Sequence, residues 1–187
     1  GAIQFALNYA AEAEKQMMQE ADAQRKNELK EIAEVCRRVP METPRNFREA
    51  VQAFWFTYLL GHIEGSHLGY SPGRLDAVLI PYFKNDPDCT FEKAVSLFEE
   101  MFVKMTQIEY IASLSWQGLG HGNLYQNLIL GGVDENNDKS NNEISLAILQ
   151  AQINMQMTQP TLSVWWDDKL DNEFLLKAAE CVKTGVG

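Results

Sequence analysis

Residues 126–133 read "QNLILGGV", a short apolar run that ends at two glycines, and this pattern predicts a buried strand. Residues 160–166, "PTLSVWW", predict a second strand for the same reason. Between them, Ser140 and Glu143 have the spacing of a capping box at the start of "SNNEISLAILQAQINMQMT", so a helix is expected there. A strand, a helix and a strand in this order predict a βαβ unit near residues 127–166, with two parallel strands.

Long helices are predicted on the N-terminal side of this unit. Residues 3–37 are rich in Ala, Glu, Gln, Lys and Met, which predicts one long helix or two helices with a break near residues 21–24. Thr43 is the expected N-cap of the next helix, with Pro44 at its first position. One broad face of that helix is expected to be buried through six apolar side chains: Phe47, Val51, Phe54, Trp55, Tyr58 and Leu59.

Two further helices are predicted by their boundaries. Thr90 is expected to start a helix over residues 91–113, which has acidic residues near its beginning. The last helix is expected to run from about Asp171 to Lys183 and to stop at Gly185. Its apolar side should comprise Phe174, Leu175, Ala178 and Val182. The fold class is therefore α/β and helix-rich, and two parallel strands are too few for a covered sheet, so the chain is expected to be part of a larger α/β protein.

Composition excludes several classes of protein. The chain has 187 residues, 45% of them apolar, and a net charge of −10, with no cluster of Lys and Arg, so we expect no nucleic-acid partner. No apolar run approaches the roughly 20 residues that a membrane span needs, and no cationic leader precedes one, so a cytoplasmic location is expected. The three cysteines, Cys36, Cys89 and Cys181, lack any CxxC pair and are expected to be reduced and structural.

The stretch "HIEGSHLGYSPGRLD", residues 62–76, invites two catalytic interpretations. Metal binding by His62, Glu64 and His67 is disfavoured, because their spacing does not place them on one helix face. A hydrolase nucleophile elbow at "GYSPG" is disfavoured as well, since the residue after the serine is Pro72, which has no N–H to donate to an oxyanion. We therefore predict no metal site and no catalytic residue in this stretch.

Two loops raise weaker alternatives. The glycines of "GLGHGNLYQ", residues 118–126, precede a strand, whereas phosphate-binding loops follow one, so close backbone packing is favoured, although His121 could line a pocket. In residues 134–145 the alternating polar residues resemble the start of a calcium loop, but Lys139 replaces its glycine and Ser145 its last glutamate. A solvated turn is the favoured interpretation of that segment.

Four blocks, taken in order, carry a more specific signal. They are "CRRVPMETPRNFREAVQAFWF" (36–56), "HIEGSHLGYSPGRLDAVLIPYFKND" (62–86), "LILGGVDENNDKSNNEISLAILQAQ" (128–152) and "TQPTLSVWWDDKLDNEFLLKAAECVKTGVG" (158–187). Together they resemble consecutive blocks of the pyruvate formate-lyase-like domain of glycyl radical enzymes, so residues 1–187 are expected to form part of that domain. The resemblance implies a fragment of a ten-stranded α/β barrel.

The resemblance also implies a radical mechanism for a longer protein. In this family a radical-SAM activating enzyme installs a radical on a glycine near the C-terminus, and the radical passes to a cysteine whose thiyl starts the chemistry. None of the three cysteines stands in the family's cysteine motif. The thiyl-cysteine loop and the C-terminal glycyl radical domain are therefore expected to lie outside this chain, which should bind no cofactor itself and be inactive alone.

Within the family, residues 62–76 and 113–132 look most like the arylacetate decarboxylase branch, which implies decarboxylation of an aryl acetate such as 4-hydroxyphenylacetate. The resemblance places Ser66 against the substrate, where a small hydroxyl could hold a carboxylate or hydroxyl, and His121 is a second candidate contact. Diol dehydratases carry polar residues where this chain has Leu68 and Gly69, which favours a flatter, more apolar ligand. Arg74 and Asp76 are expected to form a structural ion pair that fixes the loop.

The implied partners are a small-molecule carboxylate substrate, the activating enzyme and other copies of the chain, and a small partner subunit is left open. Three enzyme alternatives remain within the family: a glycyl radical diol dehydratase, a hydrocarbon-adding succinate synthase and a formate acetyltransferase-like enzyme. A further alternative is a stand-alone helical binding module that uses the aromatic face of residues 47–59.

Overall fold

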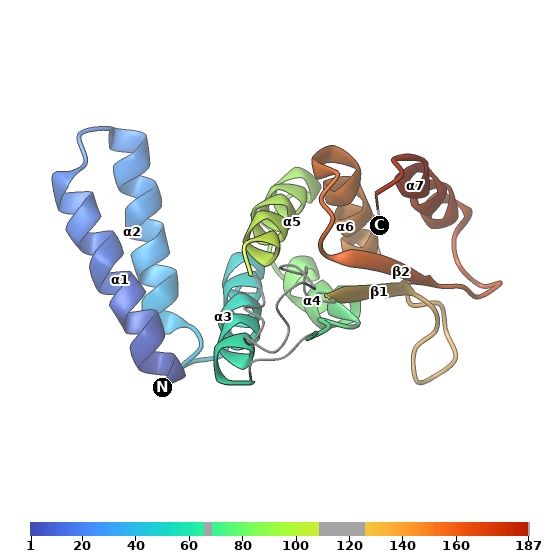
Figure 1. The fold of residues 1–187 in the computed structure, drawn as a ribbon, viewed down its shortest axis with the longest axis horizontal. Coiled ribbons are helices and arrows are strands. Elements are labelled where there is room, and N and C mark those ends of the chain that lie inside the picture. Colours follow the sequence, from blue (N-terminus) through green and yellow to red (C-terminus); the bar gives the residue numbers. More distant parts are fainter. Residues whose placement is uncertain (66–68, 109–125, 187) are drawn as a thin grey trace, which may run out of the picture. The chain divides into compact units, whose positions relative to one another are not determined.

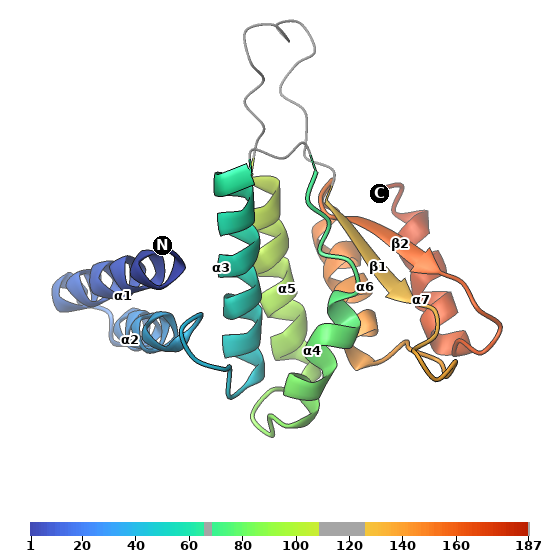
Figure 2. The same ribbon diagram turned by 90° about the horizontal axis from the view of Figure 1, so that it is seen from below.

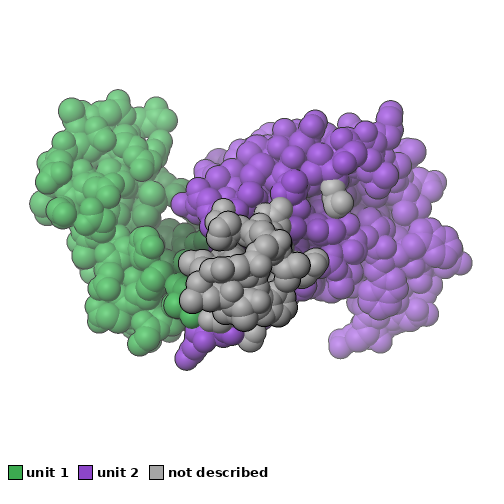
Figure 3. Space-filling model, viewed as in Figure 1, with its two compact units in different colours: residues 1–63 green, residues 64–187 purple. Residues whose placement is uncertain are grey.

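The computed structural model describes residues 1–65, 69–108 and 126–186, and the chain divides into two compact units. Unit 1 comprises residues 1–63 and unit 2 comprises residues 64–187 (Figure 3). Each unit has its own buried residues.

Unit 1 begins with a helical hairpin of α1 (Ala2–Gln19) and α2 (Ala23–Arg38), which pack side by side (Figure 1). The sequence left open one helix or two, and the structure has two, because Asp22 begins a new helix by accepting a hydrogen bond from the backbone N–H of Arg25 at 2.7 Å. Small residues of α1 and the Cys36 side chain of α2 pack with Phe56 of α3 (Phe47–Gly65), which gives unit 1 its core.

The start of α3 differs from the prediction. Thr43 and Pro44 precede the helix, and Asn46 caps it by accepting a hydrogen bond from the backbone N–H of Glu49 at 2.9 Å. Asn is a stronger N-cap than Thr, and Glu49 also accepts a hydrogen bond from the backbone N–H of Arg45 at 2.7 Å, which fixes the chain just before the helix. The buried face was predicted in part: Phe47, Val51 and Tyr58 are buried, whereas Phe54, Trp55 and Leu59 are only partly buried.

Unit 2 contains the predicted βαβ unit. The strands β1 (Asn127–Gly131) and β2 (Thr161–Trp165) are parallel, with Asn127 opposite Thr161 and Gly131 opposite Trp165, and α6 (Glu143–Met155) connects them. Around them lie α4 (Leu75–Lys84), α5 (Phe91–Thr106) and α7 (Asn172–Lys183) (Figure 2). The α6 helix packs against α4, α5 and α7. The helix-rich α/β prediction is confirmed.

One face of β1 is covered by helices. The side chains of Leu128 and Leu130 are fully buried, and α4 packs against β1, whereas Asn127 and Ile129 point to the opposite face and stay partly exposed. On the edge of β1 away from β2, Gly73 forms a parallel backbone bridge with Leu128. Thus β1 has β2 on one side and the segment before α4 on the other.

Three other helix boundaries test the predictions. Thr90 caps α5 by accepting a hydrogen bond from the backbone N–H of Lys93 at 3.3 Å, as predicted. The cap of α6 is Asn142, with Ser145 completing its capping box, so the predicted pair of Ser140 and Glu143 was wrong. The α7 helix buries Phe174, Ala178 and Cys181, while Val182 is 78% exposed and Leu175 partly buried, so the predicted apolar side was misplaced by one residue at its end.

Candidate functional site

The segment from Gly69 to Asp76 runs between the undescribed residues 66–68 and α4, and β1 holds it by its edge. The N–H of Gly73 donates to the carbonyl of Asn127 at 3.2 Å, and the N–H of Ile129 donates to the carbonyl of Gly73 at 2.9 Å. Gly73 has φ +68°, a conformation that favours glycine. The Ser71 hydroxyl accepts a hydrogen bond from the N–H of Asn127 at 3.3 Å. This serine therefore contributes to anchoring the segment.

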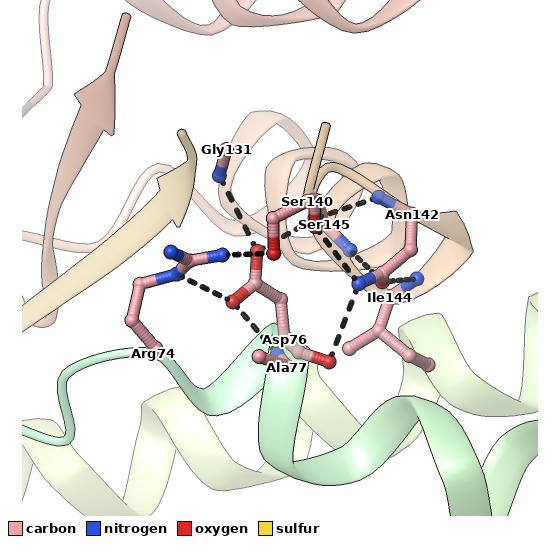
Figure 4. A network of polar contacts seen from close by, with 8 residues as sticks. All are labelled: Arg74, Asp76, Ala77, Gly131, Ser140, Asn142, Ile144 and Ser145. Atoms are coloured by element: carbon pink, nitrogen blue, oxygen red, sulfur yellow. Dashed lines mark hydrogen bonds and ion pairs between the residues drawn. The ribbon is translucent and has the colours of Figure 1, made fainter. Parts of the chain in front are cut away.

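Asp76 is the centre of a polar network at the start of α4 (Figure 4). Its side chain has no exposed surface, and its carboxylate accepts four hydrogen bonds. Oδ1 accepts from Arg74 Nε at 3.2 Å and from the N–H of Ala77 at 2.8 Å. Oδ2 accepts from the Ser145 hydroxyl at 2.8 Å and from the N–H of Gly131 at 3.3 Å. One carboxylate thus joins the first turn of α4, the end of β1 and the first turn of α6.

Arg74 extends this network toward β2. Its NH2 group donates to the Ser140 hydroxyl at 2.6 Å, and its guanidinium carbon lies 5.9 Å from the centre of the Trp165 ring. Asn142 adds a further link, since its side-chain amide donates to the backbone carbonyl of Asp76 at 3.5 Å while its oxygen caps α6. The sequence indicated Arg74 and Asp76 but neither Asn142 nor Ser145, whose partners are 66 and 69 residues away.

The chemistry of this network suits a fixed support. The four hydrogen bonds fill the acceptor positions of this buried carboxylate, and every one of its partners is a donor. A general base needs a free lone pair directed at a substrate proton, and Asp76 has none within the described part of the chain. Arg74 and Asp76 do form an ion pair, and their structural role remains a prediction.

The two predicted substrate contacts, Ser66 and His121, lie outside the described residues. Gln126, the first described residue after the segment that contains His121, is well anchored. Gln126 is 1% exposed, and its side-chain amide donates to the carbonyl of Met105 at 3.0 Å. Its backbone N–H donates to the side-chain carbonyl of Gln159 at 3.2 Å. Gln126 therefore joins the start of β1 to the end of α5 and to the segment before β2.

In the parts of the chain that the structure describes, no cluster of three or more His, Cys, Asp or Glu side chains has the arrangement of a metal site, and His67 lies outside those parts. His62 is 8% exposed and packs edge-on against Tyr58, with ring centres 4.7 Å apart. The Asp134 carboxylate accepts hydrogen bonds from the N–H groups of Asn136 and Asp138, which makes the calcium-like segment a turn. No described helix has the length and apolar character required to span a membrane.

The three cysteines are free thiols in apolar or partly buried positions. Burial raises the pKa of the Cys36 thiol to about 11, and burial together with the charge of Asp86 raises the pKa of the Cys89 thiol to about 11. Burial also raises the pKa of Cys181. A raised pKa disfavours the thiolate that a nucleophilic cysteine needs, so these residues do not fit that role.

Comparison with known proteins gives one family for the whole chain. The model of the family described as "Pyruvate formate lyase-like" matches residues 1–187. Indoleacetate decarboxylase of Tractidigestivibacter scatoligenes is 41% identical over 191 residues, which is 100% of this chain and 22% of that protein. The 4-hydroxyphenylacetate decarboxylase glycyl radical subunit of Clostridioides difficile is 33% identical over 185 residues, 97% of this chain and 20% of that protein.

A solved structure agrees with this match. The glycerol-bound form of the B12-independent glycerol dehydratase from Clostridium butyricum superposes with a TM-score of 0.92 at 35% identity, covering 98% of this chain and 24% of that one. The chain spans about a fifth of the length of the curated relatives it matches. The predicted resemblance and the predicted barrel-type α/β fold are thereby confirmed, and the chain belongs to the pyruvate formate lyase-like family of glycyl radical enzymes.

Proposed function

We propose that the protein containing this chain decarboxylates an aryl acetate by glycyl radical chemistry, and that residues 66–76 form one wall of its substrate pocket. The observation that carries the proposal is the 41% identity to an indoleacetate decarboxylase along the entire chain. A second relative at 33% identity acts on a 4-hydroxyphenylacetate, by its name. Both names describe an aromatic ring that carries an acetate group.

The residues of the wall have the chemistry that such a substrate needs. Leu68 and Gly69 present apolar or minimal side chains, which suits a flat aromatic ring. Ser66 offers a hydroxyl that can donate a hydrogen bond to a carboxylate. The Asp76 network and the bridge of Gly73 to β1 hold the described end of this wall, and a rigid support is what orients a substrate for reaction.

The thiyl cysteine of the family is not assigned to any cysteine of this chain. A glycyl radical, when present, generates the thiyl that starts the reaction, and none of Cys36, Cys89 and Cys181 stands in the family's cysteine motif. We propose that this chain binds and orients the carboxylate substrate while another part of the protein supplies the radical, so that residues 1–187 alone are inactive. The activating radical-SAM enzyme is the partner that this chemistry requires.

A test of the function uses the full-length protein after anaerobic activation. Indole-3-acetate, 4-hydroxyphenylacetate, glycerol, and pyruvate with coenzyme A are each supplied, and the products are identified by mass spectrometry. We expect an aryl acetate to yield the methylarene and carbon dioxide in equal amounts. Formation of an aldehyde from glycerol, with the aryl acetates unchanged, would instead establish a diol dehydratase. Acetyl-coenzyme A and formate from pyruvate would establish the formate acetyltransferase-like alternative.

The diol dehydratase is the second candidate, and the TM-score of 0.92 to a glycerol dehydratase supports it. The decarboxylase is preferred, because the 41% identity to indoleacetate decarboxylase exceeds the 35% identity to that dehydratase. The stand-alone helical module is disfavoured by the family match along residues 1–187. The word "subunit" in the name of the C. difficile relative supports a multi-subunit assembly, which native mass spectrometry of the full-length protein would test.

A further inference from the structure

One face of the two-stranded sheet carries polar side chains, and the function proposed above assigns them no role. On β1, Leu128 and Leu130 are fully buried on the side of the helices. The strand register places Asn127 and Ser163 together on the other face, and both side chains are partly buried. Two polar residues on the face away from the helices are an unusual use of a short parallel strand pair, whose residues are mostly apolar in buried sheets.

The two side chains contact each other across the strands. The Ser163 hydroxyl donates to Asn127 Oδ1 at 2.9 Å. This bond leaves the lone pairs of Ser163 Oγ as acceptors and the Nδ2 group of Asn127 as a donor. None of the described residues accepts a hydrogen bond from that Nδ2 group. The pair therefore offers both a neutral acceptor and a neutral donor on the same face.

The fold of the family indicates that this face points into the barrel. In α/β barrels the helices cover the outside, and the strand residues that alternate with the helix-facing ones point into the barrel. Leu128 and Leu130 face helices, so Asn127 and its partner Ser163 face the interior. The N–H of Asn127 also donates to Ser71, in the same segment as the proposed substrate wall, so the pair lies beside that wall.

We infer that Asn127 and Ser163 are specificity-determining residues that recognise a neutral hydrogen-bond donor on the ring of the substrate, such as an indole N–H or a phenol O–H. This inference rests on the proposed arylacetate decarboxylase function. The proposed wall already offers the Ser66 hydroxyl to the carboxylate, so the ring is the part of the substrate that remains for the pair. Ser163 Oγ matches a ring donor, and Asn127 Nδ2 can in addition meet a phenol oxygen. A hydrogen-bonding site of this kind discriminates against a ring that lacks the donor.

The test measures ring selectivity in the full-length, anaerobically activated protein. For each variant, kcat/KM is determined for 4-hydroxyphenylacetate against phenylacetate, and for indole-3-acetate against 1-naphthylacetate, so that the two arms separate the phenol donor from the indole donor. For the pair that contains the preferred substrate, the selectivity is kcat/KM for the ring with the donor divided by kcat/KM for the ring without it. Ser163→Ala should lower this ratio about tenfold, which corresponds to the loss of one neutral hydrogen bond. Ser163→Thr, which keeps the hydroxyl, should retain at least part of that preference. Asn154→Ala, an exposed change on α6, is the matched control.

Each possible result either supports the inference or overturns it. A loss of preference in Ser163→Ala, with the melting temperature and radical content of the wild type, supports the inference. An active wild type whose preference survives Ser163→Ala overturns the inference and leaves the decarboxylase proposal standing. An equal fall in kcat/KM for both members of a pair overturns it as well, because that result marks a structural role. A wild type that decarboxylates no aryl acetate overturns the proposed function and this inference with it.

Discussion

The Ser145 hydroxyl donates a hydrogen bond of 2.8 Å to Asp76 Oδ2, although the two residues are 69 positions apart in the chain. Both lie in the first turn of a helix, Ser145 in α6 and Asp76 in α4. Their contact fixes the starts of these helices to each other and to the end of β1, where the N–H of Gly131 donates to the same carboxylate oxygen. The segment that leads from the proposed substrate wall into α4 is thereby held from its C-terminal end.

Replacement of Asp76 should strongly destabilise the protein. Asp76→Ala leaves Arg74 and the Ser145 hydroxyl without their buried partner, and the loss of one member of a buried ion pair costs about 3–5 kcal/mol of unfolding free energy. Urea unfolding followed by circular dichroism measures this change. Asp134→Asn is the matched control, because Asp134 is exposed and its carboxylate accepts hydrogen bonds from the N–H groups of its close neighbours Asn136 and Asp138, so a change below about 1 kcal/mol is expected. Equal stabilities of the two variants would contradict the network.

The cap of α6 can be identified by a pair of substitutions. Asn142→Ala should destabilise the protein by about 1–2 kcal/mol, since its oxygen accepts hydrogen bonds from the N–H groups of Ile144 and Ser145. Ser140→Ala should cost less, because it removes only the contact with Arg74, which is itself partly exposed. Chemical denaturation of both variants under identical conditions gives the comparison. A larger loss in Ser140→Ala would restore the cap that the sequence suggested.

Gly132 is expected to be intolerant of any side chain. Its φ is +69°, and a Cβ added there would lie 2.5 Å from the Trp165 ring. Gly132→Ala should therefore cost about 3 kcal/mol of unfolding free energy through backbone strain and overpacking. Gly185→Ala has the same backbone strain at φ +73° but no neighbour within 4 Å, so about 1 kcal/mol is expected for this control.

A double variant separates the two causes at Gly132. Adding Trp165→Ala to Gly132→Ala removes the ring that a Cβ would meet. The double variant should be more stable than the sum of the two single effects predicts, by an amount that measures the steric part. Additive losses would show that backbone strain alone is responsible.

Glu49 should contribute acid-sensitive stability to unit 1. Burial alone would raise the pKa of its carboxyl, but hydrogen bonds from Arg45 and the charges of Arg45 and Arg38 outweigh burial and hold the pKa below its ordinary value of 4.5. A carboxyl whose pKa is lowered by folding stabilises the folded state above the unfolded pKa, and this contribution is lost as the pH falls through the folded pKa. Stability should thus decline below about pH 4.5.

Glu49→Gln is the variant that tests this pH dependence. It should be less stable than the wild type at pH 7, and the difference between the two should shrink as the pH falls below about 4.5. Unfolding free energies at several pH values between 7 and 3 provide the measurement, with Glu100→Gln on the exposed side of α5 as the control. A constant difference across this range would show that Glu49 acts without its charge.

The sequence allowed the βαβ unit to be predicted, because glycines and a proline bound both apolar runs and the parallel pairing follows from the connection. Cap residues were harder to predict. Ser140 and Asn142 are both good caps, and the choice between them depends on Arg74, which lies 66 residues from Ser140 and takes its hydroxyl. The α4 helix was missed, because no side chain caps its start and Pro81 lies inside it.

The candidate site, too, could be predicted from the sequence only in part. Arg74 and Asp76 could be identified, because they are neighbours in one short stretch. Their partners Ser145 and Gly131 could not, since no local pattern distinguishes a serine in a helix turn that meets a carboxylate from one that meets water. The pair of Asn127 and Ser163 also required the strand register, because only the register places the two side chains on one face.

The Asp76 network is expected to orient the substrate wall, and one substitution tests this role directly. Ser145→Ala removes one donor from Asp76 and leaves the ion pair with Arg74 in place, so the protein should still fold. In the full-length, anaerobically activated protein, with radical content measured by electron paramagnetic resonance, kcat and KM are determined for the preferred aryl acetate. We predict that Ser145→Ala raises KM or lowers kcat by about tenfold at unchanged radical content, while Asp134→Asn behaves as the wild type. Wild-type kcat and KM in Ser145→Ala would contradict this role of the Asp76 network.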